Sequence, residues 1–149
     1  MKNPAFVIKS VTVKVLNTLT VTFGDGKELD VNLSKIIDSH PTLSLLKDLK
    51  VFNQAHVDTF GTGVRWTNEI DLAGDNLRAE AIEQAGGISH EQIWNWMYRN
   101  HLTLDTAAEA LGISRRMVAY YRNGEKTVPK HIWLACLGWE NFVAQKKAA

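Results

Sequence analysis

The 149-residue sequence is short of cysteine, of long apolar runs and of net charge. Its only cysteine, Cys136, excludes a disulfide framework of the kind that holds small secreted domains together. No segment approaches the roughly 20 apolar residues of a membrane-spanning helix, and the N-terminus lacks the continuous apolar stretch of a secretory leader. We therefore expect a cytoplasmic, globular protein without a membrane partner.

Patterns typical of catalysis and of metal binding are also missing. His90-Glu91 lacks the second histidine of a zinc-binding helix motif, because Trp94 occupies that position. Gly61 and Gly63 are followed by no Lys-Ser or Lys-Thr pair, so turn geometry explains both glycines better than a phosphate-binding loop does. The sequence predicts no enzyme, no cofactor and no metal ion.

The small net charge is unevenly distributed along the chain. Residues 89–149 carry eight Lys and Arg against five Asp and Glu, a balance of +3, whereas residues 1–88 carry nine against eleven, a balance of −2. This asymmetry indicates one part that faces nucleic acid and one that does not. Because a balance of +3 attracts DNA only modestly, we expect two copies to be needed, as in a homodimer.

The N-terminal part has the alternation of apolar and polar residues that is typical of β-strands. Extended segments are expected at residues 6–15, 19–23, 27–33, 51–57 and 63–66. Gly24-Asp25-Gly26 indicates a hairpin, Ser34 can cap a helical turn, and a short helix is expected at residues 42–49. An irregular or helical segment is expected from Asp71. The natural arrangement is an antiparallel sheet with short helices.

A set of short motifs runs through residues 6–80. It comprises the opening Val-x-Val strand, Leu19-Thr-Val-Thr-Phe-x-Asp-Gly, Asp30-Val-Asn-Leu, Leu46-Lys-Asp, Phe52-Asn-Gln with Val57-Asp58, and Val64-x-Trp66 followed by Glu69-x-Asp71-Leu72. With these motifs the segment resembles a group of short bacterial domains of unknown function. The resemblance implies an α+β fold with an antiparallel sheet, and it implies no catalytic mechanism.

The boundary between two domains is expected at Gly86-Gly87. Residues 77–85 have helical composition, which the two glycines interrupt before Ser89, a residue able to cap the next helix. We therefore predict an α+β domain over residues 1–85 and an all-helical domain over residues 86–149. Pro129 fits the first turn of a helix at residues 130–137, and residues 139–143 end the expected bundle.

Residues 102–124 predict two short helices joined by a tight glycine turn. Apolar residues at positions 104, 107, 108 and 111 form one stripe along the first helix, which Thr103 is placed to cap. Gly112 follows the last apolar position, where a left-handed backbone costs glycine little. Ser114 is placed to cap the second helix, in which Val118 and Tyr121 continue the inward stripe.

The outer face of the second helix is basic and aromatic. It is expected to carry Arg115, Arg116, Ala119, Tyr120 and Arg122. Such a face suits a DNA groove, although an ordinary helical hairpin with a solvated basic face is the alternative interpretation. Small residues where the helices cross, and a second helix ended within about three turns by Asn-Gly, favour DNA binding.

The spacing of these residues extends beyond the two helices. It includes Leu102-Thr103, Ala108, Leu111-Gly112-Ile113-Ser114, Val118, Asn123-Gly124, Pro129 and residues 134–138. Through this spacing, residues 89–143 resemble the Cro and lambda-repressor class of helix-turn-helix domains. The resemblance implies a lambda-repressor-like bundle in which Arg115, Arg116 and Tyr120 meet base edges, and Ser114 and Asn123 meet phosphate. Leu104 departs from the class, which often has a phosphate-binding glutamine there.

We expect a sequence-specific DNA-binding protein, a bacterial transcriptional regulator that reads the major groove with residues 114–122. The candidate DNA-binding residues are Thr103, Ser114, Arg115, Arg116, Tyr120, Arg122, Asn123 and Lys126, with Lys130 as a further phosphate contact. The main alternative is a protein-interaction module, for instance an antitoxin-like partner, that docks through edge strands of the N-terminal sheet. It does not exclude DNA binding. A small-molecule sensor in the N-terminal domain is the third hypothesis.

Overall fold

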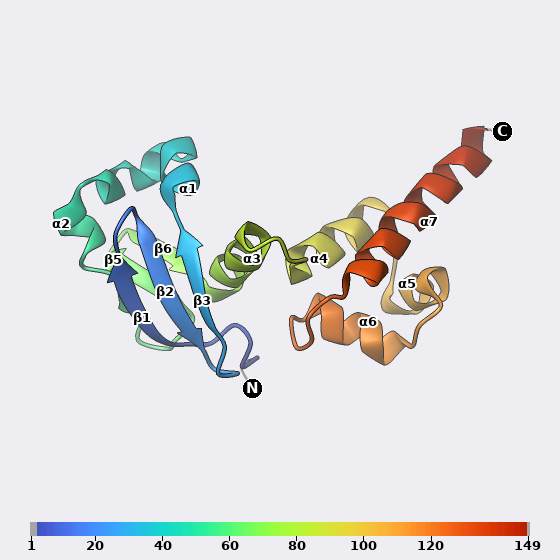
Figure 1. Ribbon diagram of the computed structural model, residues 1–149, viewed down its shortest axis with the longest axis horizontal. Helices are drawn as coiled ribbons and strands as arrows, with labels where there is room; N and C mark the ends of the chain where they lie inside the picture. The colour runs from blue at the N-terminus through green and yellow to red at the C-terminus, as the bar shows by residue number, and fades with distance from the viewer. Residues whose placement is uncertain (1–2, 149) are drawn as a thin grey trace. The chain divides into compact units, whose positions relative to one another are not determined.

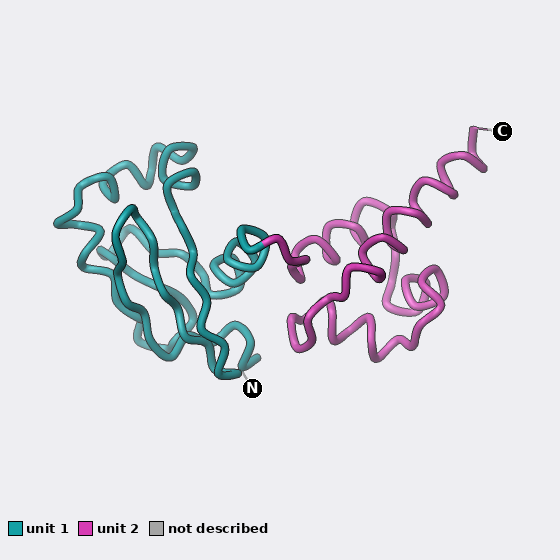
Figure 2. Tube along the Cα trace, in the orientation of Figure 1, with its two compact units in different colours: residues 1–85 teal, residues 86–149 magenta. Residues whose placement is uncertain are grey.

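The computed structural model describes residues 3–148, and the chain divides into two compact units, residues 1–85 and 86–149 (Figure 2). The first unit contains two three-stranded antiparallel sheets (Figure 1). One sheet consists of β1 (Ile8–Lys14), β2 (Thr18–Phe23) and β3 (Glu28–Asn32), with β2 in the middle. The other consists of β4 (His56–Val57), β5 (Gly63–Thr67) and β6 (Ile70–Ala73), with β5 in the middle.

Short helices link the two sheets of the first unit. They are α1 (Ser34–Ser39), the 3-10 helix η1 (Pro41–Lys47) and α2 (Leu49–Phe52), and the longer helix α3 (Gly74–Gln84) follows β6. In the middle strand β2, Leu19, Val21 and Phe23 alternate into the core. Trp66 on β5 donates its indole N–H to the Phe52 carbonyl at 3.0 Å, which joins the second sheet to α2.

A buried arginine holds α3 against the turn between β2 and β3. Arg78 donates to Asp25 Oδ2 at 2.7 Å and to the Ala5 carbonyl at 2.8 Å, and its guanidinium carbon lies 5.0 Å from the Phe23 ring centroid. Burial alone would raise the pKa of Asp25. The hydrogen bond and charge of Arg78, with the Lys27 N–H, outweigh it and leave that pKa below its usual value. Arg78 therefore joins α3 to the turn through Asp25 and to the N-terminal segment through the Ala5 carbonyl.

The sequence prediction for the first unit needs four corrections. Residues 49–52 are helical and only residues 56–57 of the expected extended segment form a strand. The expected helix at residues 42–49 is a 3-10 helix that begins at Pro41. Ser34 is the first residue of α1 and does not cap it, because the N-cap is Leu33 and the helix has no side-chain cap. The segment from Asp71 belongs to β6, so the strands form two sheets.

The two glycines of the β4–β5 loop have different causes. Gly61 has a left-handed φ of 72°, which confirms the predicted turn geometry. Gly63 instead lies in β5, where an added Cβ would stand 2.5 Å from the Leu72 carbonyl oxygen. The close approach of β5 to β6, and not turn geometry, therefore explains the second glycine.

Within residues 86–148, the second unit contains four helices, α4 (His90–Arg99), α5 (Leu104–Leu111), α6 (Arg115–Arg122) and α7 (Lys130–Ala148). Its core is formed by buried side chains from all four: Ile93, Trp96, Met97, Ala107, Ala108, Val118, Tyr121, Ile132 and Cys136. Trp96 donates its indole N–H to the Cys136 carbonyl at 2.9 Å. Arg99 makes two hydrogen bonds to the Glu140 carboxylate, at 2.6 and 3.0 Å, so α4 and α7 are joined by polar contacts as well.

The last helix is longer than the sequence predicts. One continuous helix replaces the expected separate segments at residues 130–137 and 139–143, because Gly138 does not interrupt it. A glycine costs an α-helix only about 1 kcal/mol relative to alanine, and Ile132, Cys136 and Trp139 pack against the core on either side of it. In residues 3–148, no helix combines the length and the apolar character that crossing a bilayer requires.

Candidate nucleic-acid interface

The helices α5 and α6 have the caps and the turn that the sequence predicts. Thr103 Oγ1 accepts a hydrogen bond from the Thr106 N–H at 3.1 Å, and Thr106 Oγ1 accepts one from the Thr103 N–H at 2.8 Å. Gly112 ends α5 with a left-handed φ of 68°. Ser114 caps α6 by accepting a hydrogen bond from the Met117 N–H at 3.1 Å. These three cap predictions are confirmed.

Helix α6 has one buried face and one exposed face. Val118 and Tyr121 are buried in the core of the helical unit, as the stripe predicts. Arg115 and Arg116, at the start of the helix, are exposed, and Tyr120 is half-buried one turn further on. The exposed face therefore combines two cations with one aromatic ring that is partly fixed by packing.

Arg116, Tyr120 and Lys126 form a contiguous group, here called the Arg-Tyr-Lys cluster. Arg116 Nε donates a hydrogen bond to Tyr120 Oη at 2.6 Å, and the guanidinium carbon lies 5.4 Å from the centroid of the ring. Lys126 Nζ lies over the same ring, 4.7 Å from its centroid. Two positive charges thus flank one aromatic ring, an arrangement that cation–π attraction favours.

The turn after α6 places Lys126 in this cluster. The Tyr120 carbonyl accepts hydrogen bonds from the N–H groups of Glu125 at 3.0 Å and Lys126 at 3.3 Å. Asn123 is the C-cap of α6 and is half-buried, and Gly124 has a left-handed φ of 73°. The backbone of Tyr120 therefore fixes the turn, while its side chain contacts both cations.

Arg115 has an acidic neighbour on the preceding helix. Its Nε lies 3.6 Å from Asp105 Oδ1, and both side chains are largely exposed. Such surface ion pairs contribute little to stability. The carboxylate nevertheless offsets part of the positive charge of Arg115 on the exposed face of α6.

Arg122 lies elsewhere than predicted. Its guanidinium carbon is 4.6 Å from the ring centroid of Trp94 on α4, the side chain is half-buried, and Nε is enclosed without a hydrogen-bond partner. The expectation that Arg122 lies on the outer face with Arg115 and Arg116 is therefore wrong. The physical reason is that its position, one residue after Tyr121, lies beside the buried stripe and within reach of an aromatic side chain.

Sequence reasoning missed the partners of these arginines. These partners are Asp105 for Arg115 and Trp94 for Arg122. The signal for Trp94 was an aromatic residue on the surface of α4, since an exposed indole is a favourable site for a guanidinium. No spacing rule identifies Asp105, because its contact with Arg115 joins two different helices.

The single cysteine is a core residue of the helical unit. Cys136 is fully buried, and burial raises the pKa of its thiol to about 12, so the thiolate is suppressed at neutral pH. Among residues 3–148, no three His, Cys, Asp or Glu side chains are grouped so that they could hold a metal ion.

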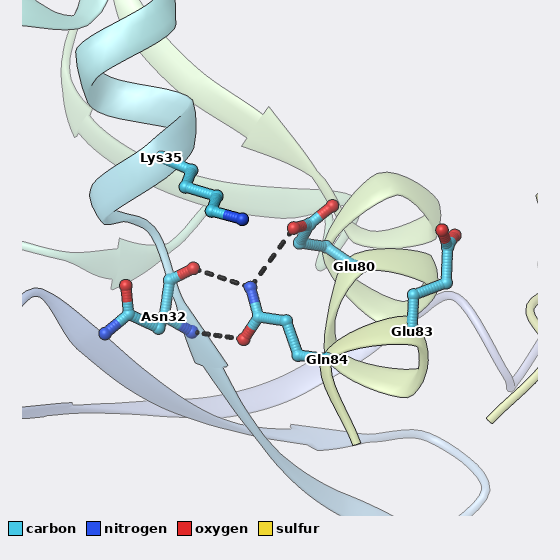
Figure 3. Close-up of a pocket in the computed structure, with 5 residues that line it drawn as sticks. All are labelled: Asn32, Lys35, Glu80, Glu83 and Gln84. Carbon is cyan, nitrogen blue, oxygen red and sulfur yellow. Dashed lines mark hydrogen bonds between the residues drawn. The ribbon is translucent and has the colours of Figure 1, made fainter. Parts of the chain in front are cut away.

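A shallow hollow of about 470 Å³ in the first unit involves the free side of β3, an edge strand of its sheet (Figure 3). Gln84 on α3 accepts a hydrogen bond from the Asn32 N–H at 2.8 Å and donates one to the Asn32 carbonyl at 2.7 Å. The amide also donates to Glu80 at 3.1 Å. Because Gln84 occupies the backbone groups of Asn32, the last residue of β3, an added strand cannot pair with that residue.

The chain is similar to a described family and to a solved structure. The family described as "Protein of unknown function (DUF2442)" matches residues 8–83, slightly more than half of the chain. The crystal structure of "Putative DNA Binding Protein NE0471" from Nitrosomonas europaea ATCC 19718 matches with 42% sequence identity and a TM-score of 0.86, covering 93% of this chain and 90% of that one. No curated protein matches the chain. The chain therefore belongs to the DUF2442 family, whose function is unknown.

Proposed function

We propose that the protein is a sequence-specific DNA-binding protein that acts without catalysis, a transcriptional regulator in the bacterial cytoplasm. The segment from α5 to α6 acts as a helix-turn-helix within a lambda-repressor-like unit, and the residues of α6 enter the major groove. The observation that carries the proposal is the exposed first turn of α6, with Arg115 and Arg116 standing clear of the core.

Two further observations support the proposal. The positive balance of the chain lies in residues 89–149, the part that contains α6. The structure from Nitrosomonas europaea, similar over most of both chains, is named for DNA binding. A protein 42% identical over this length is expected to share its fold and the general class of its partner.

The candidate residues divide into base and phosphate contacts. Arg115 and Arg116 are the candidates for guanine, whose O6 and N7 accept a bidentate arginine. Thr103, Ser114, Asn123, Lys126 and Lys130 are the candidates for phosphate. Backbone N–H groups at the starts of α5 and α6 add to these contacts, because helix N-termini attract anions. Arg122 is removed from the DNA contacts and becomes a support of α6, since it packs on Trp94.

We also propose that two copies bind together. A balance of +3 on the helical part gives one copy a weak attraction to DNA. Two reading helices related by a two-fold axis would recognise half-sites about 34 Å, or one turn of DNA, apart. Sedimentation of the protein with and without duplex would measure the number of copies bound.

Selection from a library of random duplexes tests the function. The full-length protein should enrich a defined sequence, and the variant Arg115→Ala/Arg116→Ala should enrich none. The matched control is Lys146→Ala/Lys147→Ala, which removes two positive charges from exposed positions of α7 in the same unit. The control should weaken binding to all duplexes slightly and enrich the wild-type sequence. If the wild-type protein enriches nothing, the proposed function is wrong.

A protein-interaction role of the first unit is the second candidate, and an apolar surface favours it. Val15 and Leu16, in the turn between β1 and β2, are 82% and 80% exposed, and Leu49 is exposed beside them along a hollow of about 580 Å³. Leu16 also has a left-handed φ of 60°, which a leucine rarely adopts. A strained, exposed apolar residue at a hairpin tip is typical of a contact site.

A further inference from the structure

The two arginines at the start of α6 differ in how they are held. Arg115 is exposed and lies near Asp105, whose carboxylate competes with any acceptor on DNA. Arg116 is held through its Nε by Tyr120 Oη, a neutral oxygen that leaves the full positive charge of the guanidinium in place. Among the described residues, the two terminal nitrogens of Arg116 have no hydrogen-bond partner. These nitrogens are the ones that can bind O6 and N7 of guanine end-on.

Tyr120 is well placed to fix Arg116. Its carbonyl holds the turn after α6 through Glu125 and Lys126, its ring is half-buried, and Lys126 lies over that ring. An arginine side chain on a helix surface otherwise samples many rotamers, and ordering it on binding costs conformational entropy. An arginine that is already ordered in the free protein avoids part of this cost.

We propose that Arg116 is the guanine-reading residue of α6 and that Tyr120 is the positioning residue that aims it. This inference rests on the proposed function, and it resolves which of the two arginines reads the base. Lys126 then serves as the phosphate contact beside the guanine, because the shared Tyr120 ring keeps it next to Arg116. Arg115 contributes charge and contacts to the DNA backbone.

The simpler interpretation is a surface pair four residues apart on a helix, which stabilises a helix slightly and does nothing else. The two interpretations predict different results for the Tyr120→Phe variant. This variant keeps the ring and both cation–π contacts and removes only the hydroxyl that accepts the Arg116 hydrogen bond. A surface pair predicts a small change in stability alone, whereas a positioning role predicts a change in base discrimination.

The test uses the duplex that the wild-type protein enriches from a random library, and copies of it in which one guanine at a time is replaced by 7-deazaguanine. This base lacks the N7 acceptor. The wild-type protein should bind about tenfold more weakly when the guanine read by Arg116 is replaced, in line with the value of one good bidentate contact. Arg116→Ala should be insensitive to the same replacement, while Arg115→Ala should remain sensitive to it.

Tyr120→Phe should reduce the tenfold discrimination to about threefold, with its affinity for a random duplex changed less than twofold. In the Arg116→Ala background the same substitution should have no further effect on discrimination, because there is no side chain left to aim. Thermal unfolding of each variant shows whether it is folded.

Three outcomes would overturn the inference. If Tyr120→Phe weakened binding to the enriched duplex and to a random duplex equally, Tyr120 would be a phosphate contact. Unchanged discrimination in Tyr120→Phe would remove its positioning role, and loss of guanine sensitivity in Arg115→Ala alone would assign the reading to the other arginine. In each of these cases the protein still selects a sequence, so the proposed function survives. Failure of the wild-type protein to enrich any sequence would overturn both.

Discussion

The guanidinium of Arg122 lies over the indole ring of Trp94, 4.6 Å from the ring centroid, and so joins the last turn of α6 to α4. The three arginines of one short helix therefore have three different surroundings. Arg115 is near a carboxylate, Arg116 is hydrogen-bonded to a phenol, and Arg122 is packed on an indole. Substitutions of these three arginines are therefore expected to have different effects on stability and on DNA binding.

Replacing Arg122 by alanine should destabilise the helical unit and leave base preference unchanged. A partly desolvated cation–π pair contributes about 1 kcal/mol, and the apolar part of the arginine side chain adds packing against α4. Urea denaturation of Arg122→Ala, Trp94→Ala and the double variant measures the coupling between the two side chains. A coupling near zero, or a changed sequence preference in a folded Arg122→Ala protein, would contradict the structural role.

Replacing Asp105 by asparagine should strengthen binding to every duplex. The change removes a negative charge beside Arg115, and a surface pair of this kind is worth roughly 0.2–1 kcal/mol. We therefore expect affinity to rise by about 1.4-fold to fivefold at low salt, with an unchanged sequence preference, in fluorescence anisotropy titrations. The control Glu109→Gln, which neutralises another carboxylate of α5, should have a smaller effect. A drop in affinity for Asp105→Asn would show that the carboxylate holds Arg115 in a productive position.

The exposed hairpin tip gives a test of the second candidate function. Leu16→Asn should raise the free energy of unfolding by about 1 kcal/mol, because asparagine tolerates the left-handed backbone that leucine occupies at φ 60°. The same variant should lose a protein partner that binds Val15 and Leu16. Unfolding midpoints measure the first effect, and titration with a co-purified partner measures the second. A variant that binds such a partner as well as the wild-type protein does would locate the interaction elsewhere.

The buried pair of Arg78 and Asp25 predicts a dependence of stability on pH. Asp25→Asn should cost about 3 kcal/mol at neutral pH, because Arg78 is left buried without its counter-charge. The pKa of Asp25 is lowered in the folded protein from 3.8, so the pair stabilises the fold above pH 3.8 and this contribution is lost as pH falls through the lowered pKa. Urea midpoints of wild-type and variant protein should differ equally at pH 7 and 5 and converge below 3.8. A difference between the two urea midpoints that stays constant at all pH values would contradict this prediction.

Much of the fold could be predicted from the pattern of neighbouring residues in the sequence. Thr103, Gly112 and Ser114 act on neighbouring backbone groups, so their roles can be predicted from spacing alone. The strands around Gly24-Asp25-Gly26 were predictable for the same reason, since alternation and a turn motif are properties of adjacent residues. The strand β6 was missed because it forms by pairing with β5. The predicted last helix ended too early because the sequence does not show that residues on both sides of Gly138 pack against the same core.

The candidate site was predictable in composition and not in arrangement. Spacing placed Arg116 and Tyr120 on one face of a helix, four residues apart. It did not reveal that Lys126 joins them, because that contact depends on the turn held by the Tyr120 carbonyl. Arg122 was misplaced for a similar reason, since only the packing of α4 beside α6 brings Trp94 within reach.

The central claim is that the outer face of α6 meets duplex DNA, and thiol protection tests it most directly. Native Cys136 is buried and its thiol has a pKa of about 12, so it should not react. Ala119→Cys places one reactive thiol between Arg115 and Tyr120, and Ala144→Cys places one on an exposed position of α7 as the control. Saturating amounts of the enriched duplex should slow alkylation of the first thiol at least tenfold and leave the second unaffected. Equal alkylation rates of the first thiol with and without duplex would contradict the account.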